Sequence, residues 1–191
     1  MALPTRIDAQ SVPELLKLLL EAPQSTLPDL VTSLEGRSDL TSYDDFIDAA
    51  IAQVNLWPSP QRAAFIEGHP RIGEQSSAIS AASAKEQGAI PAALPTPPEV
   101  LARLAHLNAC YERVYPNLRY ITFVNGRSRA EIALEMEDFL GIPHSLSPDS
   151  PAVDTFVSIE SDSTQWLAEL DRAVQDVGRI AKSRALAAGR P

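Results

Sequence analysis

Residues 99–115, EVLARLAHLNACYERVY, carry the most regular helical pattern in the chain. Their apolar side chains recur at the spacing that places them on one face of an α-helix, namely Val100, Leu104, Leu107, Tyr111 and Val114. Asn108 falls at the edge of this face, and a half-buried amide needs hydrogen-bond partners. The stretch therefore predicts a long amphipathic helix with Asn108 bonded inside the protein.

Proline divides the rest of the chain into further helices. The sequence has 16 prolines, and proline favours the first turn of a helix and interrupts its interior. Besides 99–115, helices are predicted over residues 14–21, 28–34, 43–56, 60–67, 83–94, 128–140 and 164–188. The strand-like run RYITFV at 119–124 has no partner strand, which predicts an extended link. We therefore expect an all-α fold, a single-domain bundle of about eight helices over residues 1–191.

Two segments stand out from this pattern. The predicted helix at 14–21 has leucines at five of the six positions from 15 to 20, which favours burial on a wide face. Residues 142–163 are rich in Pro, Ser and Asp and predict a mobile surface insert.

Composition limits the partners and the compartment. A net charge of −9 argues against nucleic acid and anionic membranes as partners, because both require a basic surface. No run approaches the roughly 18 apolar residues of a membrane helix, and the start MALPTRIDAQ lacks the apolar core of a signal peptide. The one cysteine, Cys110, forms no disulfide framework and is expected to be a small core residue. A cytoplasmic location is expected, and local arginines still allow a small anionic ligand.

Residues 65–87, FIEGHPRIGEQSSAISAASAKEQ, concentrate side chains suited to chemistry. His69 precedes Pro70, which disfavours helical geometry and predicts a non-helical corner. Its imidazole can exchange a proton near neutral pH, although a single loop histidine is also explained as a turn residue bonded to the backbone. Ser83 followed by Glu86 is also the pattern of a helix capping box, and the spacing alone does not separate a cap from a site.

The last predicted helix ends its apolar stripe on an arginine. Arg184 continues the stripe of Leu167, Leu170, Val174, Val177 and Ala181. A buried guanidinium needs an anion, whereas one near a helix end can also extend to solvent. Both interpretations stay open on the spacing alone.

Patterns for metals, cofactors and nucleophiles are missing from the sequence. Three histidines and one cysteine form neither H-E-x-x-H nor paired cysteine spacing, and there is no phosphate-binding glycine loop or serine nucleophile motif. His106 falls on the polar face of its helix and is expected to be solvated, and His144 lies in the insert. We therefore expect no cofactor and no metal, and a proton-transfer set that includes His69 and Glu86.

Four blocks in order provide a more specific signal. They are G-H-P-R-I-G at 68–73, S-x-x-E-Q at 83–87, L-N-x-x-Y-E at 107–112 and F-V-x-G-R at 123–127. Together they resemble the 2-oxo-4-hydroxy-4-carboxy-5-ureidoimidazoline (OHCU) decarboxylases of urate degradation. The resemblance runs from about residue 40 to 141, and the I-x-x-x-R pattern at 180–184 adds a match in the last helix.

The resemblance implies a homodimeric, cofactor-free enzyme that converts OHCU, an anionic ureidoimidazoline, to (S)-allantoin in purine catabolism. It implies three catalytic residues: His69 as general acid/base, Glu86 as the group that orients the imidazole or promotes carboxylate departure, and Arg184 as the carboxylate anchor. It also implies substrate contacts from Pro70, Ser83, Gln87, Arg119, Tyr120, Ile121, Thr122 and Phe123.

The chain departs from the family pattern in two places. Residues 115–124 are longer by about one residue, which shifts assignments in the link by up to one position, and the 142–163 insert is additional. The chain ends in A-G-R-P rather than a peroxisomal S-K-L signal. The leucine-rich helix at 14–21 offers apolar surface for a dimer interface. The alternative function is a catalytically inactive helical interaction module, which is expected to have lost His69, Glu86 or Arg184.

Overall fold

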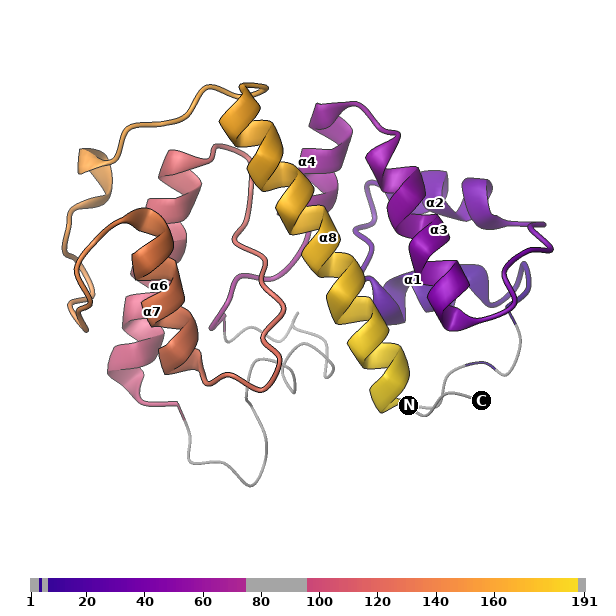
Figure 1. The fold of residues 1–191 in the computed structure, drawn as a ribbon, viewed down its shortest axis with the longest axis horizontal. Coiled ribbons are helices and arrows are strands. Elements are labelled where there is room, and N and C mark those ends of the chain that lie inside the picture. Colours follow the sequence, from indigo (N-terminus) through magenta and orange to yellow (C-terminus); the bar gives the residue numbers. More distant parts are fainter. Residues whose placement is uncertain (1–3, 5–6, 75–95, 189–191) are drawn as a thin grey trace. The chain divides into compact units, whose positions relative to one another are not determined.

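A computed structural model describes residues 4, 7–74 and 96–188 of the chain (Figure 1). Within these residues there are seven α-helices, one short 3-10 helix and no strand, which confirms the all-α prediction. The helix predicted at 83–94 lies outside the described residues. The chain divides into two compact units: Met1–His69 with Leu167–Pro191 (unit 1) and Pro70–Trp166 (unit 2). The single-domain organisation stays a prediction.

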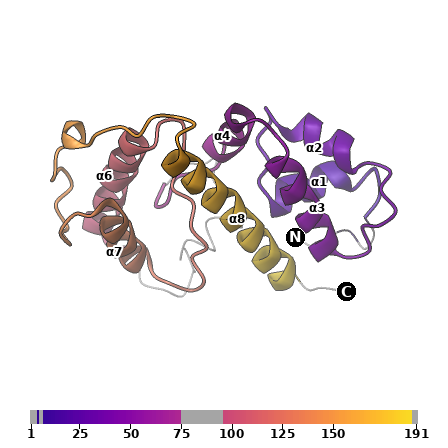
Figure 2. The same ribbon diagram turned by 45° about the horizontal axis from the view of Figure 1, so that its top comes forward.

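Unit 1 is a group of packed helices. It contains α1 (Val12–Leu19), α2 (Leu27–Leu34), α3 (Tyr43–Asn55), α4 (Ser59–Glu67) and most of α8 (Thr164–Ala187). Helix α2 packs against both α1 and α3, as both views show (Figures 1 and 2). Ion pairs connect α8 to its neighbours, from Lys182 to Asp48 on α3 and from Arg62 on α4 to Asp171.

The helix boundaries follow local signals. Ser42 and Ser128 each accept a hydrogen bond from the amide three residues later and form complete capping boxes with Asp45 and Glu131. Gly141 ends α7 in the left-handed conformation that glycine adopts easily (φ 67°). These short-range interactions explain why the predicted and observed helices agree within one or two residues.

Helix α1 ends two residues earlier than predicted. Glu21 has φ 48°, which is outside the helical region, and the amide of Ala22 returns to the carbonyl of Leu16 at 3.1 Å. The leucines at 15, 16, 19 and 20 are all buried within the chain, and Leu18 is half-buried. The helix therefore does not offer the apolar surface that the sequence assigned to a dimer interface, and the homodimer stays a prediction.

Unit 2 is built on α6 (Pro98–Val114) and α7 (Arg129–Leu140), which run side by side (Figures 1 and 2). The 119–124 run has no regular secondary structure, as the predicted link requires. Aromatic side chains fill the space between the helices and the link: Tyr111 lies 5.3 Å from Tyr120 and 5.9 Å from Phe139, measured between ring centroids. This packing gives the link a fixed place against α6 and α7.

The 142–163 insert lies on the surface and is tethered to α6. It contains the 3-10 helix η1 (Val153–Thr155). Nη1 of Arg103 donates to the carbonyls of Ser147 (2.8 Å) and Ser150 (2.5 Å). His106 contacts the carbonyl of Pro151 at 2.9 Å, so it is half-buried and its prediction as a solvated residue is wrong. Main-chain contacts therefore hold the insert that the sequence predicted to be mobile.

Arg103 also forms a buried ion pair. Its Nε lies 2.7 Å from Oε1 of Glu137 on α7, and neither side chain is exposed to solvent. The same carboxylate oxygen accepts the amide of Ser145 at 3.0 Å. The pair thus joins α6, α7 and the start of the insert.

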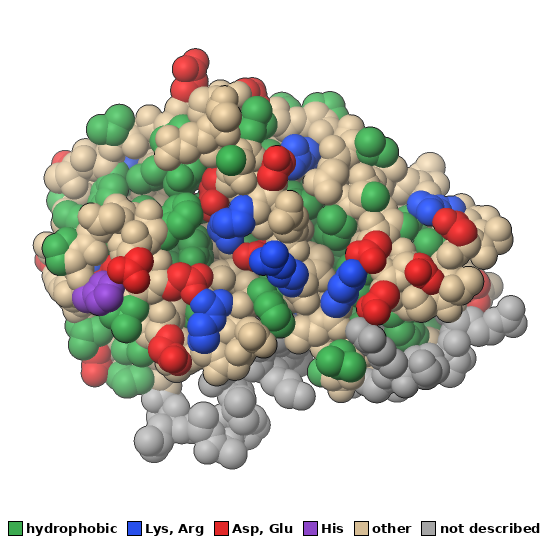
Figure 3. Space-filling view, viewed as in Figure 1, with side chains coloured by type: hydrophobic (Ala, Val, Ile, Leu, Met, Phe, Trp, Pro, Cys, Tyr) green, Lys and Arg blue, Asp and Glu red, His purple; other side chains and the backbone are tan. Residues whose placement is uncertain are grey.

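Charges of both signs are mixed on the surface. On the face shown in Figure 3, basic side chains lie beside acidic ones. On α8, for example, Arg172 pairs with both Glu169 and Asp176. No helix in the described part of the chain is long and apolar enough to cross a membrane.

Candidate functional site

His69 lies at the non-helical corner predicted for it, just after α4. Gly68 caps the helix, and the His69 side chain is buried, with 6% of the residue exposed. Its Nδ1 lies 2.8 Å from the carbonyl oxygen of Phe65, and its Nε2 lies 2.9 Å from that of Leu20. The ring of Phe65 meets the imidazole edge to face, with centroids 5.0 Å apart. These contacts fix the plane of the imidazole.

The surroundings of His69 act on its protonation in opposite directions. Burial lowers the pKa of the imidazole below its ordinary value, whereas the carbonyls of Leu20 and Phe65 and the carboxylate of Glu21 oppose that shift. A neutral imidazole has a single N–H, so it donates to only one of the two carbonyls, while the imidazolium donates to both. Burial prevails, and the charge of Arg184 adds to its effect, so the imidazole is neutral at rest.

Arg184 lies in the last turn of α8 and points into unit 1. Its Nη1 donates to the carbonyl of Leu19 at 3.1 Å, and its Nη2 lies 3.0 Å from Oε2 of Glu21. The Arg184 side chain is 7% exposed and that of Glu21 is 12% exposed. The arginine is thus buried beside an anion, and the alternative of a side chain extended to solvent is wrong.

Residues 19–21 bring His69 and Arg184 together. Glu21 has a left-handed backbone (φ 48°) directly after α1, at a position where glycine is usual because other residues are strained there. The resulting turn presents the Leu20 carbonyl to His69 and the Leu19 carbonyl to Arg184. The side chain of Glu21 forms the ion pair with Arg184. Sequence reasoning missed Glu21, because no sequence pattern predicts a glutamate with a left-handed backbone conformation.

In unit 2, two of the sequence blocks lie side by side. Arg71, from the G-H-P-R-I-G block, forms a two-point ion pair with Glu112, from the L-N-x-x-Y-E block, at 2.6 and 2.9 Å. Asn108, with 3% of its surface exposed, donates to the carbonyls of Ile72 (2.9 Å) and Leu104 (2.8 Å), which confirms the prediction that it is bonded internally. A cavity of ≈ 190 Å³ adjoins them, lined by Arg71, Ile72, Gly73, Glu74, Ala105 and Asn108.

The other predicted substrate contacts are spread over the chain. Pro70 is half-buried at the start of unit 2. Tyr120, Ile121 and Thr122 are buried in the link, and Arg119 and Phe123 are half-buried. Ser83, Glu86 and Gln87 lie outside the described residues. The structure thus brings together His69 and Arg184 among the predicted catalytic residues.

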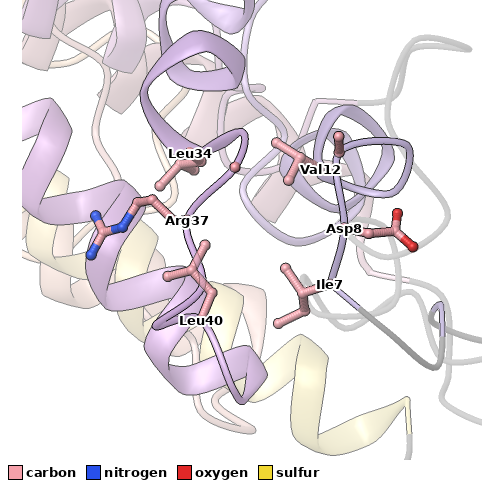
Figure 4. Close-up of a pocket in the computed structure, with 8 residues that line it drawn as sticks. Ile7, Asp8, Val12, Leu34, Arg37 and Leu40 are labelled. Carbon is pink, nitrogen blue, oxygen red and sulfur yellow. The ribbon is translucent and has the colours of Figure 1, made fainter.

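A larger cavity of ≈ 240 Å³ lies elsewhere in unit 1, near the start of the chain (Figure 4). Aliphatic side chains surround it, and the charged groups of Asp8 and Arg37 point away from it. Arg37 pairs with Asp39 at the surface. Among the described residues, none of the predicted site residues lines this cavity, so its size does not identify it as the site of the predicted chemistry.

Among residues 4, 7–74 and 96–188, no three or more His, Cys, Asp or Glu side chains are grouped so that they could hold a metal ion.

Comparison with known proteins identifies the family of the chain. No curated protein was found to match the chain. The sequence profile of the OHCU decarboxylase family matches residues 6–142, a span that includes Glu21, His69 and all four sequence blocks. Arg184 lies beyond the matched span but is bonded to Leu19 and Glu21 within it. The chain therefore belongs to the OHCU decarboxylase family.

Proposed function

We propose that this protein decarboxylates OHCU to (S)-allantoin without a cofactor. Its family membership supports a decarboxylase role in urate degradation. The observation that carries the proposal is the arrangement in unit 1, where residues 19–21 hold an imidazole and a buried guanidinium next to each other. One group exchanges protons and the other binds carboxylates.

The reaction needs both groups. When the bond from the ring carbon to the carboxylate breaks, carbon dioxide leaves and the ring carbonyl and imine of the substrate accept the electron pair. The resulting carbanion must receive one proton on one face to give a single enantiomer. A protein that holds the carboxylate and supplies that proton meets these requirements, and general acid/base catalysis of this kind is worth about 10²- to 10⁴-fold.

In this proposal Nε2 is the nitrogen of His69 that exchanges the proton. Nδ1 contacts the carbonyl of Phe65, four residues earlier in the last turn of α4, and this local bond orients the ring. Nε2 faces the carbonyl of Leu20, so substrate binding exchanges this contact for one with the substrate. His69 takes up one proton from solvent water before it gives that proton to the carbanion, and the carbonyls and the Glu21 carboxylate stabilise the intervening imidazolium.

Arg184 is proposed as the anchor for the substrate carboxylate. A guanidinium grips a carboxylate through two parallel N–H groups, provided that its plane is fixed. The Leu19 carbonyl and the Glu21 carboxylate fix that plane here. Glu21 therefore orients the anchor, and it also offsets part of the positive charge that attracts the substrate.

The remaining assignments rest on the family resemblance. We propose that Glu86 orients the imidazole or promotes carboxylate departure. Substrate contacts are proposed for Pro70, Ser83, Gln87, Arg119, Tyr120, Ile121, Thr122 and Phe123. A homodimer and a cytoplasmic location belong to the same proposal.

The test is formation of (S)-allantoin from freshly generated substrate, followed by circular dichroism. Wild-type protein is expected to give the S enantiomer. The rate of its formation should be the same before and after treatment with a chelator. The His69→Asn variant keeps a polar side chain but cannot shuttle a proton, so kcat should fall by about 10²- to 10⁴-fold with KM largely kept. His106→Asn serves as the matched control, because His106 contacts the insert instead.

Two outcomes contradict the proposal. Wild-type protein that gives no enantiomeric excess over buffer supports the inactive interaction module instead. Near-full turnover in His69→Asn removes His69 from its role, even for a chain that belongs to the family.

A further inference from the structure

The carboxylate of Glu135 joins the link at 119–124 to α7. Oε1 of Glu135 accepts hydrogen bonds from the hydroxyl groups of Tyr120 (2.7 Å) and Thr122 (2.9 Å). Its Oε2 forms an ion pair with Arg127. Bonds to a charged acceptor are stronger than bonds between neutral groups, so Glu135 ties the link firmly to the helix.

Arg127 closes the network from the other side. Its Nε donates to the carbonyl of Val124 at 2.9 Å, and its Nη2 donates to that of Phe123 at 2.5 Å. The chain reverses through Asn125 and Gly126, both left-handed (φ 47° and 79°), which brings Arg127 back over the link. Glu135 thus holds the side chains of the link directly and its main chain through Arg127.

The network also shows which side chains of the link face Glu135. Tyr120 and Thr122 are two residues apart and reach the same oxygen, as expected for side chains on one face of an extended segment. The side chains of Arg119, Ile121 and Phe123 then belong to the opposite face. The hydroxyl groups of Tyr120 and Thr122 are engaged by Glu135.

We infer that Glu135 is a positioning residue that holds the link in its substrate-binding conformation, with Tyr120 and Thr122 contributing main-chain groups rather than hydroxyls to the substrate. This inference rests on the proposed function, which assigns substrate contacts to residues 119–123.

Two glutamates on α7 give a matched pair of variants. Glu135→Ala removes the network, whereas Glu131→Ala removes the capping box at the exposed start of the same helix without touching the link. Hydrogen exchange measured by mass spectrometry on the substrate-free protein should show amides at 119–124 exchanging about ten-fold faster in Glu135→Ala, as expected from the loss of a charged acceptor. In Glu131→Ala the faster exchange should be confined to the first turn of α7.

Steady-state kinetics then test whether this network affects substrate binding. Glu135→Ala should raise KM about ten-fold with kcat within about three-fold of the wild type, because binding is weakened while His69 and Arg184 are unchanged. Glu135→Gln keeps an acceptor oxygen for the two hydroxyls and loses only the charge facing Arg127. Its KM should therefore lie between those of the wild type and Glu135→Ala. Glu131→Ala should lower the melting temperature and leave KM unchanged.

Tyr120→Phe separates the two possible roles of the hydroxyl. It keeps the ring that packs on Tyr111 and removes one bond to Glu135, so both exchange and KM should change less than in Glu135→Ala. A rise in KM as large as that of Glu135→Ala, with unchanged exchange, would mean that the hydroxyl binds substrate directly and would overturn the inference. The inference is also overturned if the wild type is active and the Glu135→Ala and Glu131→Ala variants have the same KM. A wild type without turnover overturns the proposed function and the inference together.

Discussion

Removing Arg103 should destabilise this protein more than any surface substitution. In Arg103→Met the aliphatic part of the side chain is kept and the guanidinium is lost. The carboxylate of Glu137 then stays buried without its counter-charge, and the carbonyls of Ser147 and Ser150 lose their donor. Breaking a fully buried pair by removing one partner costs about 3–5 kcal/mol of unfolding free energy.

Urea denaturation followed by circular dichroism measures this loss. With a slope of about 2 kcal/mol per M for a protein of this size, the midpoint should fall by about 2 M. Arg113→Met is the control, since Arg113 is exposed on the same helix and such substitutions change stability by about 0.5 kcal/mol or less.

The double variant Arg103→Met/Glu137→Leu makes the test sharper. Replacing both charges with apolar groups removes the uncompensated carboxylate, so the double variant should be about 2–3 kcal/mol more stable than the sum of the single losses predicts. A midpoint of Arg103→Met within 0.3 M of the wild type, on the order of 0.5 kcal/mol at that slope, refutes this account of the pair.

Four further predictions concern the site and the helix boundaries. Arg184→Lys keeps the charge but loses the planar fork, so KM for OHCU should rise; unchanged kcat and KM would contradict the role of the anchor. Ser42→Ala should cost about 0.5–2 kcal/mol in urea denaturation through loss of the α3 capping box, and a smaller loss than for Thr41→Ala would be inconsistent with it. Gly73→Ala should destabilise by about 1 kcal/mol or more, because Gly73 has φ 80° and a Cβ there would lie 3.0 Å from Leu104; equal stability would speak against this. Finally, the imidazole of His69 has a pKa of about 6.5 in the unfolded chain and a lowered pKa in the folded protein, so the unfolded chain binds protons more readily. The free energy of unfolding should therefore decline as the pH falls below about 6.5, and it should decline less steeply in His69→Asn. Equal slopes in the two proteins would show that His69 is not the group responsible.

The sequence predicted those features that depend on neighbouring residues. Ser42 and Ser128 start their helices through contacts three residues away, and the partners of Asn108 were required by its place at the edge of an apolar stripe. Arg103 was missed although it lies beside Val100 on the buried face of the same stripe, which is a usable signal. Its partner Glu137, however, is 34 residues away, and no local pattern pairs the two.

The same distinction applies to the candidate site. The block order identified His69, and the stripe on α8 marked Arg184 as an unusual arginine. Neither pattern indicates that the two meet at the end of α1, since Leu19 is 165 residues from Arg184 along the chain. Glu21 could not be anticipated for a further reason, namely that its backbone adopts a conformation that its residue type disfavours.

His69 and Arg184 both bind unit 1 through main-chain oxygens, those of Leu20 and Leu19. A main-chain oxygen is the same for every residue type, so these two contacts do not depend on which apolar side chain occupies either position. They depend instead on the number of residues between α1 and α2, because adding or removing one residue there would rotate both oxygens away. Tolerance to apolar substitution at 19 and 20, combined with intolerance to insertion and deletion over 19–23, is therefore expected, and the length of this short connection is itself part of the site.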